Sequence, residues 1–478
     1  CYVVVSEMAK NKTGKKKIVV ASILAALAMQ TAGVTDVAAA PGDQPSVAIA
    51  NGTVASGKTN GLAIGNAANS GSNQSVAIGY YSVATSAEMN PALPATAVGA
   101  GANATGISTV ALGLSAQATS GKATALGSKS VASEDAAVAV GAESKATGGY
   151  ASALGADANA SNNDATAFGH STEASGASST ALGSRAKAKG TAGVGIGMLA
   201  NATNQYGVAI GGESSSTADN SIAIGRKSSV TGENGIAIGA FTNSKGANGV
   251  AVGTNGTTTE LGGVAVGQAA KSNKFYSVAM GMNVTADGDN SVALGASASA
   301  NSDGTIAIGS YGSTPTKATG NRALAIGSAT TANGLESIAI GSRVNSTSQH
   351  SIAIGTASNA SAVKSVAIGP DSRATVDGGV ALGRDSVADV AGGVKGYNPN
   401  TNRTDIYSGL TSNVLTSTNG AVSIGNGSNV TRQLTGLAAG TNDTDAVNVA
   451  QLKSVNLAFS GNVNTGNVNI ANSTLGLK

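Results

Sequence analysis

A 14-residue repeat sets the strongest limit on what this chain can fold into. The segment Ser75-Val76-Ala77-Ile78-Gly79 recurs in closely similar form at residues 221–225 and 365–369. Its closing glycine is found 24 times between Gly65 and Gly425, and 20 of the 23 intervals between these glycines are 14 residues long. An irregular globular core does not produce such a register, whereas stacked copies of one small structural unit do. The repeat therefore predicts a solenoid.

The positions before the closing glycine alternate in size. The residue directly before the glycine is large and apolar in all 24 copies, and the residue before that is alanine in 22, with Gly195 and Ser423 as the exceptions. Because successive side chains of a strand point to opposite faces, one face of this strand is large and apolar and the other is a ladder of alanines. Apolar side chains on both faces predict that both faces are buried. The pattern does not say which face fills the solenoid.

A second short strand is expected after each closing glycine. The fifth residue after the glycine is small or β-branched, as Ala118, Val230 and Thr258 show, and turn residues follow it. Fourteen residues thus form one coil of two strands and two turns, which adds about 4.8 Å to the stack. We expect one continuous β-solenoid with essentially no helix from about Ser46 to Leu382. Only Pro370 lies within a regular repeat, at a turn, as a hydrogen-bonded solenoid requires.

The interior of one such coil is too thin to be stable alone. Aromatic residues make up 3% of the chain and charged residues 11%, and tryptophan is absent. The only cysteine is Cys1, so no disulfide can form within the chain. The strand face that does not fill the solenoid needs a partner, and a closed cyclic oligomer would supply it. The repeats do not fix the number of chains.

Residues 1–40 have the layout of an extended secretory signal. Lys15-Lys16-Lys17 precedes an apolar run of about a dozen residues and the small residues Ala38-Ala39-Ala40, after which we expect cleavage. Residues 2–10 lengthen the signal, and because the chain starts at cysteine we interpret it as truncated at its start. The lysines of this segment account for the basic balance, so no basic patch supports nucleic-acid binding.

The repeat pattern ends in a different kind of sequence. Residues 391–430 are interpreted as an inserted loop and a last repeat, and residues 431–453 as a segment that leads into a short helix. We expect Asp443, Thr444 or Asp445 to cap this helix. Its apolar side is predicted to hold Ala446, Val449, Ala450 and Leu452. From Phe459 the sequence becomes strand-like again.

Together these features resemble the YadA-like trimeric autotransporter adhesins. The repeat over residues 41–390 is similar to their head, residues 431–453 to their neck, and residues 454–478 to the start of a stalk module. Tyr397-Asn398-Pro399 resembles the loop that often precedes the neck. The resemblance implies an all-β fold: a left-handed parallel β-roll solenoid in a homotrimeric head, followed by a neck and a short α-helical coiled-coil start. It also implies type V secretion, an outer-membrane anchor through a C-terminal barrel absent from this chain, and attachment to host cells or to matrix proteins such as collagen, fibronectin or laminin.

No catalytic, cofactor or metal site is predicted. His170 and His350 lie 180 residues apart and are expected at surface turns. The scattered acidic residues are expected at solvated turns: Glu134, Asp135, Asp157, Asp164, Asp287, Asp289 and Asp303. Residues 193–197 are rich in glycine but lie in register as one more repeat, not as a phosphate loop. Ligand-binding residues remain unknown, although seven aromatic residues are candidate exposed binding spots: Tyr80, Tyr81, Tyr150, Tyr206, Phe241, Phe275 and Tyr276.

Two other functions compete with adhesion. A surface-coat rod without a specific ligand would have the same repeats, and only a binding measurement separates it from an adhesin. An ice-binding solenoid needs a flat array of threonines on its outer face, and the second strand is too irregular for that, as Ala118, Val230 and Ser244 show.

Overall fold

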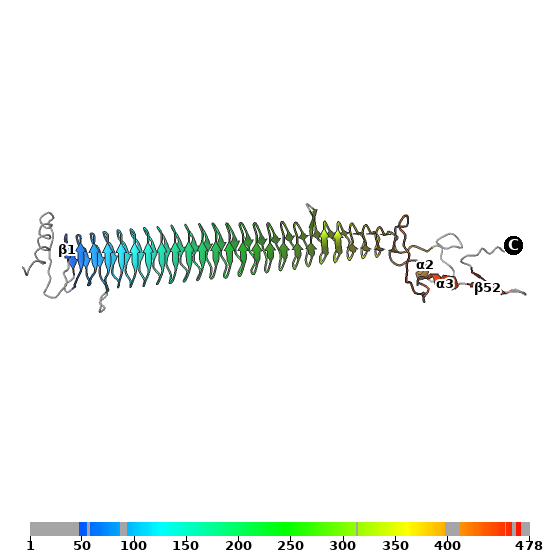
Figure 1. Cartoon of the computed structure of the whole chain (residues 1–478), viewed down its shortest axis with the longest axis horizontal. Helices are drawn as coiled ribbons and strands as arrows, with labels where there is room; N and C mark the ends of the chain where they lie inside the picture. Colours follow the sequence, from blue (N-terminus) through cyan, green and yellow to red (C-terminus); the bar gives the residue numbers. More distant parts are fainter. Residues whose placement is uncertain are drawn as a thin grey trace, which may run out of the picture. The chain divides into compact units, whose positions relative to one another are not determined.

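The computed structural model describes residues 47–54, 58–86, 93–311, 314–396, 412–454, 456–460 and 465–469. The expected signal segment (1–40) and the Tyr397-Asn398-Pro399 loop therefore lie outside the described residues. The chain forms two compact units, Cys1–Ala270 and Lys271–Lys478. Figure 1 shows the strands of each unit as stacked coils in sequence order.

Each coil contains two short strands that belong to two different sheets. Sheet A begins with β1 (Val47–Ile49), and most of its later strands are three residues long and end just before the closing glycine, as β3 (Leu62–Ile64) does. Sheet B is built from two-residue strands at the fourth and fifth positions after that glycine, such as β4 (Asn69–Ser70) and β10 (Gln117–Ala118). In unit 1 the coils continue to β30 (Thr257–Thr258) and β31 (Val264–Val266), and in unit 2 they run from β32 (Lys271–Ser272) and β33 (Val278–Met280).

Strands of neighbouring coils pair in parallel with a register of one repeat. For example, β25 (Ile222–Ile224) places Ala223 between Ala209 of the previous coil and Ala237 of the next. The ladder is the same in unit 2, where β45 (Ile352–Ile354) pairs with β47 (Val366–Ile368). The sequence prediction of a parallel β-solenoid with a 14-residue repeat is thus confirmed in both units.

Four columns of small side chains fill the interior of each coil. Sheet A contributes the alanine ladder, and sheet B contributes the fifth residue after the glycine, for example Ala223 and Val230, both fully buried. The other two columns come from the turns and consist mainly of alanine, serine, threonine and glycine. The alanine face therefore fills the solenoid, which settles the point that the sequence pattern left open.

Volumes in these columns compensate for one another. Where sheet B carries Val230, the facing turn position is Gly235, whose added Cβ would lie 2.7 Å from a Val230 methyl carbon. At Gly249 an added Cβ would lie 2.8 Å from the Ser244 hydroxyl oxygen of the same coil and 2.6 Å from the Thr258 hydroxyl oxygen of the next. Where both positions are serine, their hydroxyl groups form a buried hydrogen bond, as between Ser70 and Ser75 at 2.7 Å. The interior is close-packed, so it has no room for a larger side chain.

The closing glycine is required by conformation and by stacking. Gly225 has a φ of +126°, and a Cβ at this position would lie 2.5 Å from the carbonyl oxygen of Gly239 in the next coil. Residues other than glycine rarely adopt this backbone conformation. The two turns of a regular coil also hold left-handed residues of other types, such as Ser115 (φ 52°) and Lys122 (φ 58°).

Two interruptions of the repeat have their own structure. Between coils of unit 2, β38 (Ser310–Tyr311) and β39 (Thr314–Pro315) form an antiparallel hairpin, so Pro315 lies outside the parallel ladders. After β49 (Val380–Leu382) and β50 (Val387–Ala388), the chain leaves the solenoid and returns at β51 (Val422–Ser423), which pairs in parallel with β49. The segment between them includes the short helix α2 (Ser412–Leu415).

The predicted capping of the helix near residue 445 is wrong. Helix α3 spans Val449–Ser454, so Ala446 lies outside it. Its cap is Asn448, whose side-chain oxygen accepts the Gln451 amide at 2.9 Å while the Gln451 side chain accepts the Asn448 amide at 3.2 Å. This reciprocal pair satisfies two free amides at the start of the helix and displaces the acidic candidates. Beyond α3, β52 (Asn456–Ser460) and β53 (Thr465–Asn469) form an antiparallel pair.

Candidate interaction surfaces

The outer face of sheet A is an exposed apolar stripe. Each strand presents the residues on either side of its alanine, such as Ile222 and Ile224, to the outside of the chain. Many are substantially exposed: Leu112 has 42% and Phe168 51% of its surface accessible. The stripe includes Val110, Leu126, Leu182 and Ile238 in unit 1, and Met280, Ile306, Ile368, Leu382 and Val422 in unit 2. Soluble monomers rarely expose so extended an apolar surface, which makes this face a candidate interface.

The turn from sheet A to sheet B widens the stripe. The first residue after the closing glycine is large, apolar or aromatic and exposed at Tyr80, Leu114 and Met198 in unit 1, and at Met282 in unit 2. These side chains follow directly on the apolar positions of sheet A. In these four coils the apolar surface therefore continues around one turn.

The outer face of sheet B is polar instead. Its outward position holds Asn159, Glu173 and Lys187 in three successive coils, and each is exposed or half-buried. Between them the inward residues Ala160 and Ala174 are fully buried. Within each unit the solenoid thus has an apolar outer sheet and a polar outer sheet, and only the polar one has the composition of a surface that stays in water.

Charged residues form ladders along the turns. Lys129 binds Glu143 of the next coil at 3.0 Å, and Lys227 lies 3.5 Å from Glu213. In unit 2, Glu336 lies between Arg322 at 2.6 Å and His350 at 3.2 Å. All these side chains are solvent-exposed, at 37–70% of their surface, so each pair contributes little to stability. Their regular spacing follows from the repeat.

The residues considered for catalysis or metal binding lie at turns and do not converge. His170 and His350 occupy turns, as predicted. Some acidic side chains connect coils: Asp289 accepts the Phe275 amide at 3.3 Å, and Asp303 accepts the Asp289 amide at 2.9 Å. Within the described residues no three histidine, cysteine or acidic side chains are placed to hold a metal ion. No helix in the described part of the chain is long and apolar enough to cross a membrane.

The seven candidate aromatic residues are exposed but do not form one site. Tyr80, Tyr81 and Phe241 lie in turns that lead from sheet A to sheet B, whereas the other four lie in the opposite turns: Tyr150, Tyr206, Phe275 and Tyr276. Tyr80 and Tyr81 pack edge to face with ring centroids 4.4 Å apart. The guanidinium of Arg226 lies 4.7 Å from the ring centre of Phe241. These contacts lie within one turn for Tyr80 and Tyr81 and between neighbouring coils for Arg226 and Phe241.

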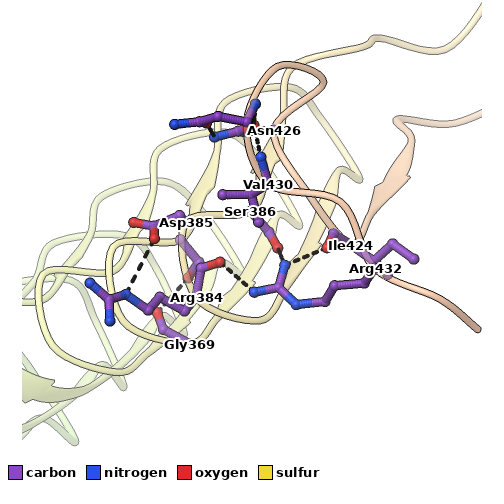
Figure 2. Close-up of polar contacts among 10 residues, drawn as sticks. Gly369, Arg384, Asp385, Ser386, Ile424, Asn426, Val430 and Arg432 are labelled. Atoms are coloured by element: carbon purple, nitrogen blue, oxygen red, sulfur yellow. Dashed lines mark hydrogen bonds and ion pairs between the residues drawn. The ribbon is translucent and has the colours of Figure 1, made fainter.

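Arg432 closes the open end of the solenoid in unit 2. Its guanidinium donates hydrogen bonds to the carbonyl oxygen of Ile424, to that of Arg384 at 2.7 Å and to the Ser386 hydroxyl at 3.1 Å (Figure 2). In regular coils, carbonyl groups at the positions of Ile424 and Arg384 accept backbone amides of the next coil. Arg432 therefore replaces the amides of a coil that does not exist, and its side chain satisfies acceptors that would otherwise be left at the end of the stack.

An open hollow of about 460 Å³ lies beside this cap, lined by residues 387–390, 421–427 and 430–432. The side chain of Asn426 shapes its rim by accepting the amides of Ser428, Asn429 and Val430 at 3.0–3.1 Å. Figure 2 shows this side chain and Arg432 within one close-up of the end of the solenoid. Apolar side chains of the last coil, Val387 and Ile424 among them, face the hollow.

The segment after the cap has polar contacts but no core of its own. The carboxylate of Asp445 accepts the amides of Thr441 and Asn442, each at 2.9 Å. Hydrogen bonds from the backbone, first from Asn442 and then from Thr441, lower the pKa of Asp445. The apolar side chains here are exposed: Leu434, Leu437, Val447, Val449 and Leu452. Val449 has 68% and Leu452 54% of its surface accessible, so helix α3 has no packing partner within the described chain.

Two protein families match this chain, one over the solenoid and one over the segment after it. The family model of the YadA head domain repeat matches more than half of the chain, at residues 56–82, 94–116, 118–144, 146–172, 174–200, 202–228, 231–255, 286–311, 318–343, 346–372 and 360–386. The model described as the coiled stalk of trimeric autotransporter adhesin matches residues 433–475. The chain belongs to the YadA-like trimeric autotransporter adhesins. In this adhesin the head repeats coincide with the solenoid coils, and the stalk match begins directly after Arg432.

A solved structure provides a weaker comparison. The collagen-binding domain of the Yersinia adhesin YadA is 27% identical to this adhesin and covers 50% of this chain and 84% of its own. The TM-score is 0.16, so the two chains do not superpose as wholes, and the family assignment rests on the family models alone. A comparison with curated protein sequences finds no match. Both matching family models describe parts of adhesins.

Proposed function

We propose that three copies of this adhesin pack through the outer face of sheet A and form a head that attaches a bacterium to host matrix or host cells. The single observation that carries the proposal is the contrast between the two outer faces of the solenoid. The face of sheet A is lined by valine, isoleucine and leucine in nearly every coil, and the face of sheet B is polar. An apolar stripe faces inward in an assembly, and a polar face remains for recognition.

The gain from covering the stripe is large when summed over the coils. Fully burying a leucine or isoleucine side chain is worth about 1.5–3 kcal/mol. Burying the two-fifths of Leu112 that remains accessible would therefore contribute about 0.6–1.2 kcal/mol. Every coil presents at least one such position and most present two, with Thr or Ser at the first position in five copies, so the sum exceeds the several kcal/mol lost when free chains associate. The number three comes from the family, because the geometry of one chain requires only a closed assembly.

The exposed apolar residues of the neck have the same explanation. Val449 and Leu452 have no partner within the described chain, and the stalk family that matches this segment is described as coiled. We propose that the three α3 helices begin a coiled coil that holds the three solenoids together. On this proposal, substituting both Val449 and Leu452 with serine lowers the temperature at which the head assembly dissociates.

Host attachment is tested by a binding panel. The purified protein is passed over immobilised collagen, fibronectin and laminin, and is incubated with epithelial cells. Saturable binding to at least one of them supports an adhesin, and absence of binding to all of them favours the surface-coat rod. A variant that lacks residues 212–225, one complete 14-residue repeat, is the matched control. A ligand that recognises the repeated polar surface should still bind this shortened head.

We further propose that the assembly is displayed at the cell surface, exported by type V secretion and anchored in the outer membrane. The support is the description of the stalk family as part of trimeric autotransporter adhesins. Labelling intact cells with an antibody to the head tests the location, with a periplasmic protein as control. N-terminal sequencing of the surface protein tests the expected cleavage after Ala40, which would leave Pro41 as the first residue.

A further inference from the structure

Five Asn-x-Ser/Thr motifs occupy the same register position in sheet B. The asparagine is the outward residue of its strand, and the hydroxyl residue is the next outward position. The residue between them points into the solenoid and is fully buried. The motifs begin at Asn103, Asn159 and Asn201 in unit 1 and at Asn345 and Asn359 in unit 2, and end at Thr105, Ser161, Thr203, Thr347 and Ser361.

Strand alternation places the asparagine and hydroxyl side chains of each motif on the outward side of the strand, and of these the side-chain oxygen of Asn103 is itself covered. At residues 201–203, Asn201 and Thr203 are accessible while Ala202 is inside. The five asparagine side chains do not donate a hydrogen bond from their amide nitrogen to any described residue. A bulky group on that nitrogen would therefore extend from the polar face and would leave the interior and the apolar stripe unchanged.

Asn243 provides a matched position without the motif. It is the outward residue of β28 (Asn243–Ser244), but Lys245 stands where the hydroxyl residue would be. Its amide nitrogen also donates to the carbonyl oxygen of Phe241 at 3.5 Å. Further motifs of this kind start in turns, such as those at Asn255 and Asn283. The five in sheet B are distinguished by a fixed outward register and by this internal control.

We propose that these five asparagines are N-glycosylation sites. The Asn-x-Ser/Thr motif is the acceptor for asparagine-linked sugars in exported proteins. The side-chain nitrogen would form a bond to the anomeric carbon of a phosphate-activated sugar. The bond between that carbon and the phosphate leaving group breaks, the amide loses one proton, and no oxidant or reductant is needed. Transfer to the chain before folding is compatible with the fold, because each acceptor nitrogen ends on the polar face.

The test is glycopeptide mass spectrometry of the full-length protein purified from the surface of the cells that make it. The expected result is sugar adducts on the motif asparagines of sheet B and none on Asn243. A single sugar would indicate a nucleotide-sugar donor, and a preassembled chain of sugars a lipid-linked donor. Unmodified asparagine at all five positions, or equal modification of Asn243, would overturn the proposal.

Two substitutions separate the motif from the fold. Thr203→Ala should abolish the adduct on Asn201 and leave the adduct on Asn159 unchanged. Lys245→Thr completes a motif at Asn243 and should create an adduct there. If Thr203→Ala leaves Asn201 modified, the sugar is not directed by the motif and the proposal is wrong. Each variant keeps the alanine ladder and the apolar stripe, so the assembly remains a readout of intact folding.

Discussion

Enlarging one alanine of the interior column should weaken the head strongly. In Ala223→Leu, three additional carbon atoms enter an interior where Ala223 is fully buried between Ala209 and Ala237 of the neighbouring coils. The sheets approach each other closely enough to fit the side chain of this column: where Gly195 replaces the alanine, even an added Cβ would collide with the carbonyl oxygen of Lys187. The leucine can be accommodated only if the two sheets move apart locally.

The size of the effect follows from the cost of overpacking. Inserting extra methylene groups into a packed core typically costs about 1–3 kcal/mol per site, and the substitution would occur once in each of three chains. We therefore expect a loss of about 3–9 kcal/mol for the assembly. The matched control is Ser229→Leu, which adds a leucine at the outward position of β26 (Ser229–Val230). Asn220→Ser is a poorer control, because Asn220 has a φ of 53°, a conformation that asparagine tolerates better than serine does.

Thermal unfolding followed by circular dichroism distinguishes the two variants. Ala223→Leu should melt at a clearly lower temperature than the unsubstituted protein, and Ser229→Leu should change the melting temperature little. Equal melting temperatures for Ala223→Leu and the unsubstituted protein would show that the alanine column does not form a packed interior, and would refute the reasoning.

Three further changes test other parts of the account. Gly225→Ala should lower the melting temperature because its Cβ would lie 2.5 Å from Gly239, whereas at Gly212 the nearest atom to an added Cβ is 3.9 Å away and Gly212→Ala should be tolerated. Arg432→Met should speed hydrogen exchange in the last coil, whereas Arg384→Met, which loses only an exposed ion pair with Asp385, should not. The pKa of Asp445 is lowered in the folded protein, so its contribution to stability is present above its ordinary pKa of 3.8 and is lost as pH falls through the lower folded value. The amide chemical shifts of Thr441 and Asn442 should follow that titration. In the variant Asp445→Asn these amide shifts should not change with pH in this way.

The solenoid could be predicted because each position of the 14-residue repeat has the same structural role in every coil, so the same kind of residue recurs there. Alternation of isoleucine and alanine around Ala223 gave the two faces of the strand, and the spacing of the glycines gave the parallel register. The orientation of the faces was not available from this pattern, since both are apolar. The orientation depends on the distance between the two sheets of a coil, which is so short that only side chains of about the size of alanine fit between them. The sequence does not give this distance.

Other features had signals that a strand pattern does not capture. The serine pairs of the interior, such as Ser70 and Ser75, lie five residues apart in turn and strand and look like ordinary polar turn residues until they are found buried. Arg432 is one arginine in a glycine-rich segment, and its role as a cap depends on carbonyl groups 8 and 48 residues earlier in the chain. The Asn448–Gln451 pair did fit the spacing of a capping box. The residues at 443–445 are also common helix caps, and they favoured an earlier start of the helix in the prediction.

Mass measurement of the assembled protein tests the central claim, that the outer face of sheet A is an interface between copies of this chain. Sedimentation equilibrium of the full chain at micromolar concentration should give three times the chain mass of 45.6 kDa. Substituting Ile222, Ile224 and Ile238 with lysine should shift the mass toward that of a single chain, whereas lysine at the sheet B positions Ser215, Ser229 and Asn243 should leave it unchanged. A stable, folded monomer of the unsubstituted protein would contradict the account.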